Sequence, residues 1–339
     1  MRLVFVTQEV DPASPVLGAT VAKIRALADR VDEVAVLADR GVDGALPANC
    51  RILRFGASTR PGRGIRFEAA LARELSRSPR PVAVVAHMCP IYAVLAAPLA
   101  RPLGVRVVLW FTHWRSSRLL AVAERVSSAV VTVDRRSFPL DSPKVVPIGH
   151  GIDLGGYPCV ERPAREALAL LTLGRTSPAK GLETVVRAVA QAPGVRLLQH
   201  GPSLTDEERR HRGELERLAA ELGIGDRVTI GGPVPAGEVP GLLAAADCLV
   251  NNMRAGATDK VVFEAAATCL PVLASNPALD GFLPPELMFP RDNAAALAVR
   301  IGEIGQADRG AIGNALRCRV EQDHSVEGWA ERIIEVASR

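Results

Sequence analysis

Short runs of almost uninterrupted apolar residues recur along the whole chain and alternate with segments of helical spacing. Strands without polar alternation are buried on both faces, which is typical of parallel sheets. The runs are Leu3–Val6, Val34–Leu37, Val82–Val85, Val105–Phe111, Ala129–Val133, Ala169–Leu173, Val195–Leu198, Val228–Ile230, Cys248–Val250 and Val272–Ala274. Helix-spaced segments such as 18–31 and 180–192 lie between them. This order predicts an α/β protein with doubly wound parallel sheets.

The alternation occurs twice, on either side of a segment rich in Gly and Pro at residues 147–158. A length of 339 residues fits two domains. We expect Rossmann-like domains at residues 1–150 and 151–339 that face each other across a central cleft, with residues 147–158 as the hinge. Three helical stretches close the chain (292–304, 307–321 and 325–337), and the last is a candidate to pack back on the first domain.

The cysteines and the hydropathy pattern indicate in which cellular compartment the protein is expected. Six cysteines occur without a CxxC or Cys/His pairing, which argues against a disulfide framework and a structural zinc. No apolar run reaches the ~20 residues needed to span a bilayer. The first twelve residues become polar too early for a signal peptide. We therefore expect a cytoplasmic protein without a structural zinc.

The net charge of +4 hides an asymmetry between the two halves. Residues 1–150 contain 21 Lys and Arg against 12 Asp and Glu, whereas residues 151–339 contain 20 against 25. Ile65, Phe67, Leu71 and Leu75 form an apolar stripe within the densest basic cluster, which consists of Arg51, Arg54, Arg60, Arg63, Arg66, Arg73, Arg77 and Arg80. The cluster predicts either contact with an anionic membrane surface or a solvated helix face. Nucleic acid is not expected, because the basic residues lack interleaved aromatics.

The turns that follow the expected strands are where ligands bind in open α/β sheets. A GxGxxG turn does not follow Leu3–Val6, and the sequence contains no GxxxxGK[ST] loop, which disfavours dinucleotide and P-loop enzymes. The turn at Gly174–Gly181 places Arg175 and Lys180 around the expected start of a helix. Cations and helix amides there would bind a diphosphate. A solvated loop with two surface cations is the alternative.

A second signal lies at residues 258–272. Thr258 or Asp259 can cap a helix in which Glu264 lies between one and two turns from the start. A carboxylate there can accept two hydrogen bonds, for example from a ribose diol. The alternative is an exposed helix Glu, against which the apolar neighbours Phe263 and Ala265 argue.

Together these segments resemble the retaining glycosyltransferases of family 4 (glycosyl transferases group 1), which have the GT-B fold. The resemblance in the second half rests on Leu173–Gly181, Leu198–Pro202, Val228–Gly232, Ala246-Asp247 and Glu264–Val272. In the first half it rests on Gly18-Ala19, Trp110–His113 and Ile148–Asp153. The resemblance implies that residues 1–150 bind the acceptor and residues 151–339 bind a nucleotide diphosphate sugar.

The resemblance also implies roles for individual residues. Arg175 and Lys180 would bind the donor diphosphate and stabilise the leaving group without a metal, and His113 would lie near the reacting sugar. A core position beside Trp110 is the alternative for His113. The implied donor-binding residues are Gly18, Gly149, Gly151, Gly174, Arg175, Lys180, Gly201, Asp259, Lys260 and Glu264. The weaker candidates for the acceptor side are His87, Arg60, Arg63 and Arg66.

One departure from the family bears on the function. Gly256 stands where the family carries the first Glu of E-x7-E, which binds the donor sugar, and Asp259 and Lys260 could partly substitute. The leading hypothesis is a hexosyltransferase-like enzyme in the cytoplasm or at the inner membrane face, with an acceptor that the sequence does not identify and for which an anionic or lipid-linked molecule is the sharper hypothesis. The alternatives are a non-catalytic relative that binds a nucleotide sugar or a partner subunit, and a GT-B sugar-nucleotide epimerase.

Overall fold

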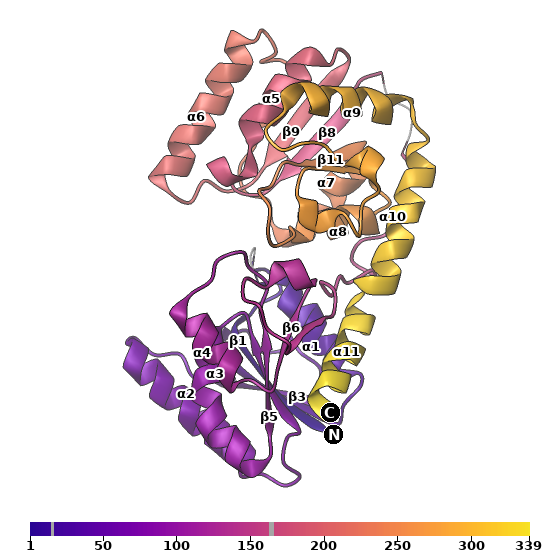
Figure 1. Cartoon of the computed structure of the whole chain (residues 1–339). Helices are drawn as coiled ribbons and strands as arrows, with labels where there is room; N and C mark the ends of the chain where they lie inside the picture. The colour runs from indigo at the N-terminus through magenta and orange to yellow at the C-terminus, as the bar shows by residue number, and fades with distance from the viewer. Residues whose placement is uncertain (15–16, 163–165) are drawn as a thin grey trace. The chain divides into compact units, whose positions relative to one another are not determined.

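The computed structural model describes residues 1–14, 17–162 and 166–339. The chain divides into two compact units (Figure 1). The first unit contains Met1–Asp153 together with Asp323–Arg339, and the second contains Leu154–Gln322.

The first unit is built on a parallel sheet, which within the described residues has seven strands in the order β3-β2-β1-β4-β5-β6-β7. The strands are β1 (Arg2–Val10), β2 (Glu33–Gly41), β3 (Cys50–Arg54), β4 (Ala83–His87), β5 (Arg106–Trp110), β6 (Ala129–Thr132) and β7 (Val145–Pro147). The helices are α1 (Ala19–Ala28), α2 (Arg60–Leu75), α3 (Pro90–Ala100), α4 (Arg118–Val126) and α11 (Val326–Ser338). The five expected strands are confirmed, and β3 and β7 are additional.

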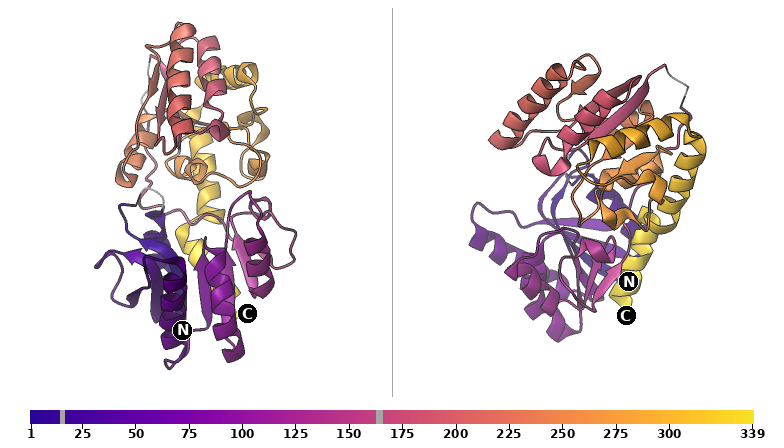
Figure 2. Two further views of the ribbon diagram at one scale, coloured as in Figure 1. Left: turned by 90° about the vertical axis from the view of Figure 1, so that its left-hand side faces the viewer. Right: turned by 45° about the horizontal axis from the view of Figure 1, so that its top comes forward.

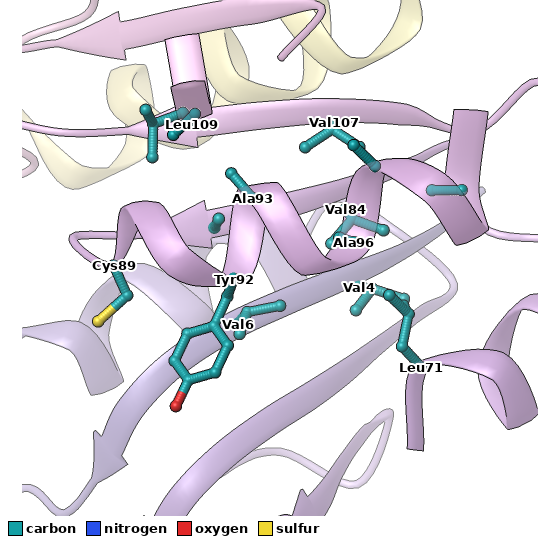
Figure 3. Close-up of a cluster of buried hydrophobic side chains, with 14 of the residues drawn as sticks. Val4, Val6, Leu71, Val84, Cys89, Tyr92, Ala93, Ala96, Val107 and Leu109 are labelled. Carbon is teal, nitrogen blue, oxygen red and sulfur yellow. The ribbon is translucent and has the colours of Figure 1, made fainter. Parts of the chain in front are cut away.

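The core of this unit explains why its strands are apolar throughout. Val4, Val84 and Val107 lie on neighbouring strands and are fully buried under α3, an almost wholly apolar helix (Figure 3). Leu71 of α2 packs into the same cluster. Helices cover the sheet, so no strand needs a polar face.

The last helix belongs to the first unit, where α11 packs against α1. Trp329 of α11 is fully buried and meets Trp110 edge to face, with 5.7 Å between ring centroids. The first and last residues of the sequence consequently lie in the same unit (Figure 1).

The second unit, which is seen from two further sides in Figure 2, contains the other parallel sheet. In the described part of the chain this sheet has five strands, in the order β10-β9-β8-β11-β12. The strands are β8 (Leu168–Leu173), β9 (Val195–His200), β10 (Val228–Ile230), β11 (Cys248–Asn251) and β12 (Val272–Ala274). The helices are α5 (Leu182–Gln191), α6 (Asp206–Glu221), α7 (Val239–Ala245), α8 (Lys260–Ala267), α9 (Ala294–Gln306) and α10 (Arg309–Asp323). The two parallel α/β sheets of the prediction are confirmed.

Each sheet has a point at which the strand order reverses. In the first unit it lies between β1 and β4, and in the second between β8 and β11. Ligands of doubly wound sheets bind beyond the carboxyl ends of the strands at such a point. The strand order therefore selects the turns after β8 and β11 as the place to examine in the second unit.

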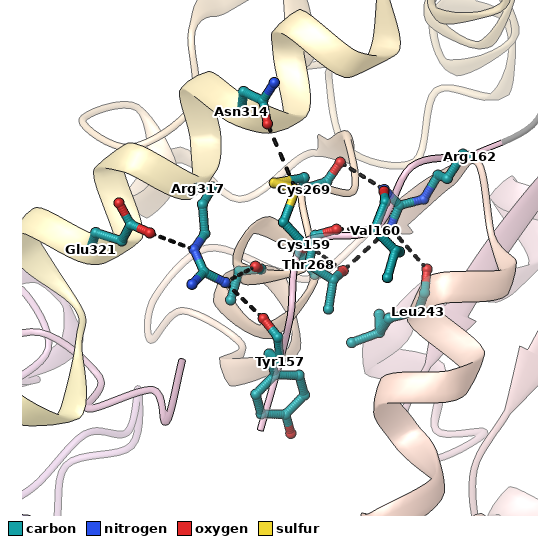
Figure 4. Close-up of a disulfide and its surroundings, with 12 residues drawn as sticks. Tyr157, Cys159, Val160, Arg162, Leu243, Thr268, Cys269, Asn314, Arg317 and Glu321 are labelled. Carbon is teal, nitrogen blue, oxygen red and sulfur yellow. Dashed lines mark hydrogen bonds and ion pairs between the residues drawn. A yellow bond between two sulfur atoms is a disulfide. The ribbon is translucent and has the colours of Figure 1, made fainter. Parts of the chain in front are cut away.

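The expectation that the cysteines form no disulfide is wrong. Cys159 and Cys269 are joined by a disulfide inside the second unit, 110 residues apart in sequence (Figure 4). Spacing could not predict this bond, because the fold alone brings the segment after Asp153 onto the end of α8. Among the described residues, no helix combines the length and apolar character needed to cross a bilayer.

Candidate functional site

An ion pair spans the reversal point of the second sheet. Lys180, in the turn after β8, contacts the carboxylate of Asp259, which precedes α8. The amide of Asn251, at the end of β11, donates to the same carboxylate over 2.8 Å. The cation that the sequence predicted for a diphosphate is therefore fixed by a protein carboxylate at the edge where ligands bind.

Arg175 lies in the same turn and remains more than half exposed. Its guanidinium is 3.2 Å from the buried carboxylate of Glu208 in α6. Arg175 and Lys180 are thus both engaged in ion pairs rather than free in a solvated loop. In a complex with a diphosphate, phosphate oxygens could take the places of the two carboxylates beside Arg175 and Lys180.

Gly201 allows the ends of β8 and β9 to approach closely. Its φ is +157°, and a Cβ there would lie 1.9 Å from the carbonyl oxygen of Gly174. Gln199 donates to that same carbonyl over 2.9 Å. No residue larger than glycine fits at position 201, which is buried, so glycine there is explained by the close approach of the turns after β8 and β9.

Glu264 is buried, with 5% of its surface exposed, so the alternative of an exposed helix Glu is wrong. One of its carboxylate oxygens, Oε1, accepts a hydrogen bond from the Tyr157 hydroxyl over 2.6 Å. Lys260, one turn earlier in α8, reaches the same oxygen at 2.5 Å. Glu264 is therefore buried and held by protein donors, and its binding of a ribose stays a prediction.

The first unit carries the remaining predicted residues. His113 follows β5 and is half-buried, and its Nδ1 accepts the backbone N–H of Arg115 over 2.9 Å. Burial and the Arg115 charge lower the pKa of His113 below its usual value. The imidazole is therefore neutral near pH 7 and carries its proton on Nε2, from which it can donate to a hydroxyl.

His87 is a buried residue of the same unit. Its ring is 4% exposed and stacks on Trp110 with 6.3 Å between centroids. Burial, followed by the charge of Lys23, holds the pKa of His87 well below its usual range. This position favours packing over contact with an acceptor.

Lys23 was not predicted from the sequence. It is 6% exposed on α1, and its ammonium lies 4.9 Å from the Trp110 ring centroid and 5.4 Å from that of Trp329. Helical spacing marked α1 as amphipathic but could not indicate that a lysine lies on its inner face.

The three predicted glycines of the first unit lie in close backbone contacts. Gly18 caps α1, and a Cβ there would lie 2.7 Å from the Ser14 carbonyl oxygen. A Cβ at Gly149 would lie 2.0 Å from the Asp323 carbonyl oxygen, and one at Gly151 would lie 3.0 Å from Trp329. These packing contacts account for the glycines without a ligand.

The basic cluster of α2 is partly neutralised. Arg60 and Arg66 are exposed, whereas Arg63 lies 3.2 Å from Asp39. Glu74, which is fully buried, pairs with Arg2, Arg51 and Arg77. These pairs tie α2 to the sheet.

The expected apolar stripe on this helix does not face solvent. Phe67, Leu71 and Leu75 belong to the core, and only Ile65 of the four is exposed. The stripe therefore cannot lie on a membrane as predicted, because folding buries it against the sheet.

Two further residues of the second unit contact the candidate site but were not predicted from the sequence. Tyr157 and Glu208 each contact a predicted site residue that is distant in sequence. The pairing of Tyr157 with Glu264 spans 107 residues, so no local pattern indicates it.

Residues 167–306, most of the second unit, match the family model described as "Glycosyl transferases group 1". D-inositol 3-phosphate glycosyltransferase of Mycobacterium tuberculosis is 34% identical over 186 residues. That alignment covers 52% of this chain and 37% of the relative, so the chain matches little more than a third of the relative's length.

Solved structures resemble the chain over nearly its whole length. Sucrose-phosphate synthase of Thermosynechococcus elongatus has a TM-score of 0.78 at 22% identity, covering 99% of this chain and 98% of that one. Anabaena HepE in complex with UDP-glucose has a TM-score of 0.77 at 18% identity, covering 100% and 99%. The fold is α/β GT-B, that of these glycosyltransferases.

Proposed function

We propose that this protein is a glycosyltransferase of family 4 that transfers a hexose, with retention, from a nucleotide diphosphate sugar to an acceptor. The observation that carries the proposal is the Lys180–Asp259 ion pair at the reversal point of the second sheet, with Arg175 in the same turn as Lys180 and Glu264 in the helix that follows Asp259. These residues lie within the segment that matches the glycosyltransferase family model. HepE, which shares the fold, has been solved with UDP and with UDP-glucose.

In the proposed reaction the second unit binds the donor. Lys180 and Arg175 leave their carboxylate partners and hold the diphosphate, and Glu264 accepts the ribose hydroxyls. When the sugar–phosphate bond breaks, negative charge develops on the diphosphate that leaves. Cations fixed beside that charge lower the barrier, since they need no reorganisation as the reaction proceeds.

The first unit supplies His113. Its neutral imidazole would donate from Nε2 to a sugar hydroxyl and orient the reacting ring. This role follows from the tautomer set by Arg115 and from the resemblance at residues 110–113.

The cationic turn also supports a mechanism without metal. Lys180 and Arg175 supply the positive charge that a divalent ion supplies in other transferases. Turnover should then persist in EDTA.

We further propose an anionic acceptor. The first unit carries the exposed cations Arg60 and Arg66. By its name, the mycobacterial relative acts on a phosphorylated inositol. A cytoplasmic location, at the inner membrane face if the acceptor is lipid-linked, completes the proposal. Co-sedimentation with vesicles that contain anionic lipid, at low salt, would test the membrane contact.

A non-catalytic nucleotide-sugar binder is the second candidate, and Gly256 favours it. Its φ of +124° is a conformation that side-chain-bearing residues rarely adopt. The loop that replaces the family's sugar-binding Glu is thus shaped around glycine, and the donor sugar loses one carboxylate contact.

A thermal-shift screen with UDP-, GDP-, ADP- and dTDP-sugars, each with and without EDTA, tests the proposal. We expect one donor to raise the unfolding midpoint and to release its sugar slowly into water or onto an acceptor. A raised midpoint without any release favours the binder. A chain stabilised by no nucleotide sugar would contradict both functions.

A further inference from the structure

A short segment of the second unit, residues 157–162, lies along the carboxyl end of α8 and is here called the strap (Figure 4). Three anchors hold it. Cys159 forms the disulfide with Cys269. Arg317 of α10 donates to the backbone carbonyl of Tyr157 over 2.7 Å. The Arg162 guanidinium donates to the carbonyls of Leu243, Ala246, Thr268 and Cys269.

The strap brings the Tyr157 hydroxyl to Glu264. The hydroxyl donates to Oε1 over 2.6 Å, and the Lys260 ammonium contacts the same oxygen at 2.5 Å. A carboxylate oxygen offers two lone pairs, so these two donors saturate Oε1. A ribose hydroxyl that binds this oxygen must displace one of them.

We infer that Tyr157 is an affinity-determining residue of the nucleotide site, because its hydroxyl occupies one of the two carboxylate oxygens of Glu264 and competes there with a ribose hydroxyl. This inference rests on the function proposed above for Glu264. Lys260 is the less effective competitor, since its side chain is flexible, 39% exposed and attractive to an anionic nucleotide. The three anchors fix the strap beside α8, so the Tyr157 hydroxyl stays within reach of Glu264 and returns to it when no nucleotide is bound.

Tyr157→Phe is the sharpest test, because it removes the hydroxyl and keeps the ring. Titration calorimetry of the oxidised protein would use UDP, GDP and ADP as probes. We expect the best-bound diphosphate to bind about tenfold more tightly to the variant, the scale of one hydrogen bond to a charged group. The unfolding midpoint without nucleotide should fall slightly at the same time, since the native protein loses that bond.

Two further comparisons show whether the effect passes through Glu264 and the strap. In a Glu264→Ala background, which has no acceptor for the hydroxyl, Tyr157→Phe should leave affinity unchanged. Cys159→Ser removes one anchor and should tighten binding by a smaller factor, about two- to threefold on the scale of a weak contact. Cys318→Ser, at an exposed free cysteine, is the matched control and should change nothing.

The outcomes separate this inference from the proposed function. Tighter binding by Tyr157→Phe that vanishes in the Glu264→Ala background supports it. If Tyr157→Phe binds the nucleotide equally well or more weakly, the inference is overturned, because the hydroxyl then does not compete with the ligand. The proposed nucleotide binding would still stand. Absence of binding of UDP, GDP and ADP by every form, wild type included, overturns the proposed function and this inference with it.

Discussion

Two cations of the second unit are paired with carboxylates that an anionic ligand can replace. Lys180 with Asp259, at the reversal point of the sheet, and Arg175 with Glu208 of α6 each join a cation of the turn after β8 to a carboxylate. The carboxylates hold the cations in place when no anion is present. A phosphate offers the same acceptor geometry with more charge, so it can replace both.

Replacing Arg175 or Lys180 by Ala should abolish most turnover and leave the fold intact. Loss of one fixed cation beside developing charge typically costs on the order of 10²–10³ in kcat. Sugar release from the donor found in the screen would measure it, with circular dichroism to monitor folding. Arg187→Ala, at an exposed arginine of α5 that pairs with Glu183, is the matched control. Wild-type activity in both site variants would refute the assignment.

The lowered pKa of His113 predicts how activity depends on pH. Its pKa is lowered by burial and by Arg115, so the neutral form persists below the usual value of about 6.5. Activity that needs neutral His113 is present above its pKa and falls as the pH drops through it. Arg115→Gln removes one lowering charge but keeps the backbone N–H, so the acid limb of kcat/KM should move to higher pH. An imidazole NMR titration of both proteins would measure the shift directly, and identical titration curves would contradict it.

At the scale of elements, burial decides what a sequence reveals. The sequence predicts strands at ten apolar runs. These runs are recognisable because helices cover the faces of the sheets, so the strands need no polar residues. Strand β3 (Cys50–Arg54) escaped because its residues are only partly buried and two of them are arginines, and β7 (Val145–Pro147) because it has three residues.

The candidate site divides in the same way. Arg175, Lys180 and Glu264 lie in turns and helix starts with recognisable patterns. Tyr157, Lys23 and the disulfide depend on contacts between elements that no local pattern records.

The disulfide should stabilise the second unit alone. Cross-linking residues 110 apart restricts the unfolded chain, and such bonds typically contribute roughly 2–4 kcal/mol. Reduction should therefore lower the urea midpoint of the second unit. All three tryptophans, at 110, 114 and 329, lie in the first unit, so the transition seen by fluorescence should stay in place while that seen by circular dichroism moves. Coincident shifts of both signals would contradict this.

At the scale of the whole molecule, the two units differ less in net charge than the two halves of the sequence do. The first unit carries 23 Lys and Arg against 17 Asp and Glu, and the second carries 18 against 20. Residues 323–339 are acidic and offset part of the excess of residues 1–153. The field available to attract an anionic acceptor is therefore smaller than the sequence halves suggest.

Trp329 should be essential to the first unit although it lies near the end of the sequence. It is fully buried between Trp110 and Lys23, and loss of a buried aromatic side chain costs about 3–5 kcal/mol. Trp329→Ala should lower the urea midpoint reported by the fluorescence of Trp110. Val122→Ala, at a half-exposed position of the same unit, should change it by less than about 0.5 kcal/mol in stability. An unchanged midpoint for Trp329→Ala would show that α11 is dispensable.

The membership of α11 also sets an order of events during synthesis. Residues 154–322 emerge from the ribosome as an uninterrupted segment that contains every element of the second unit. The first unit, although its strands are translated earlier, lacks α11 until residues 323–339 have been made. The nascent protein must therefore keep the α1 face of its first sheet uncovered while the second unit folds, and that uncovered face is where a chaperone would be expected to bind.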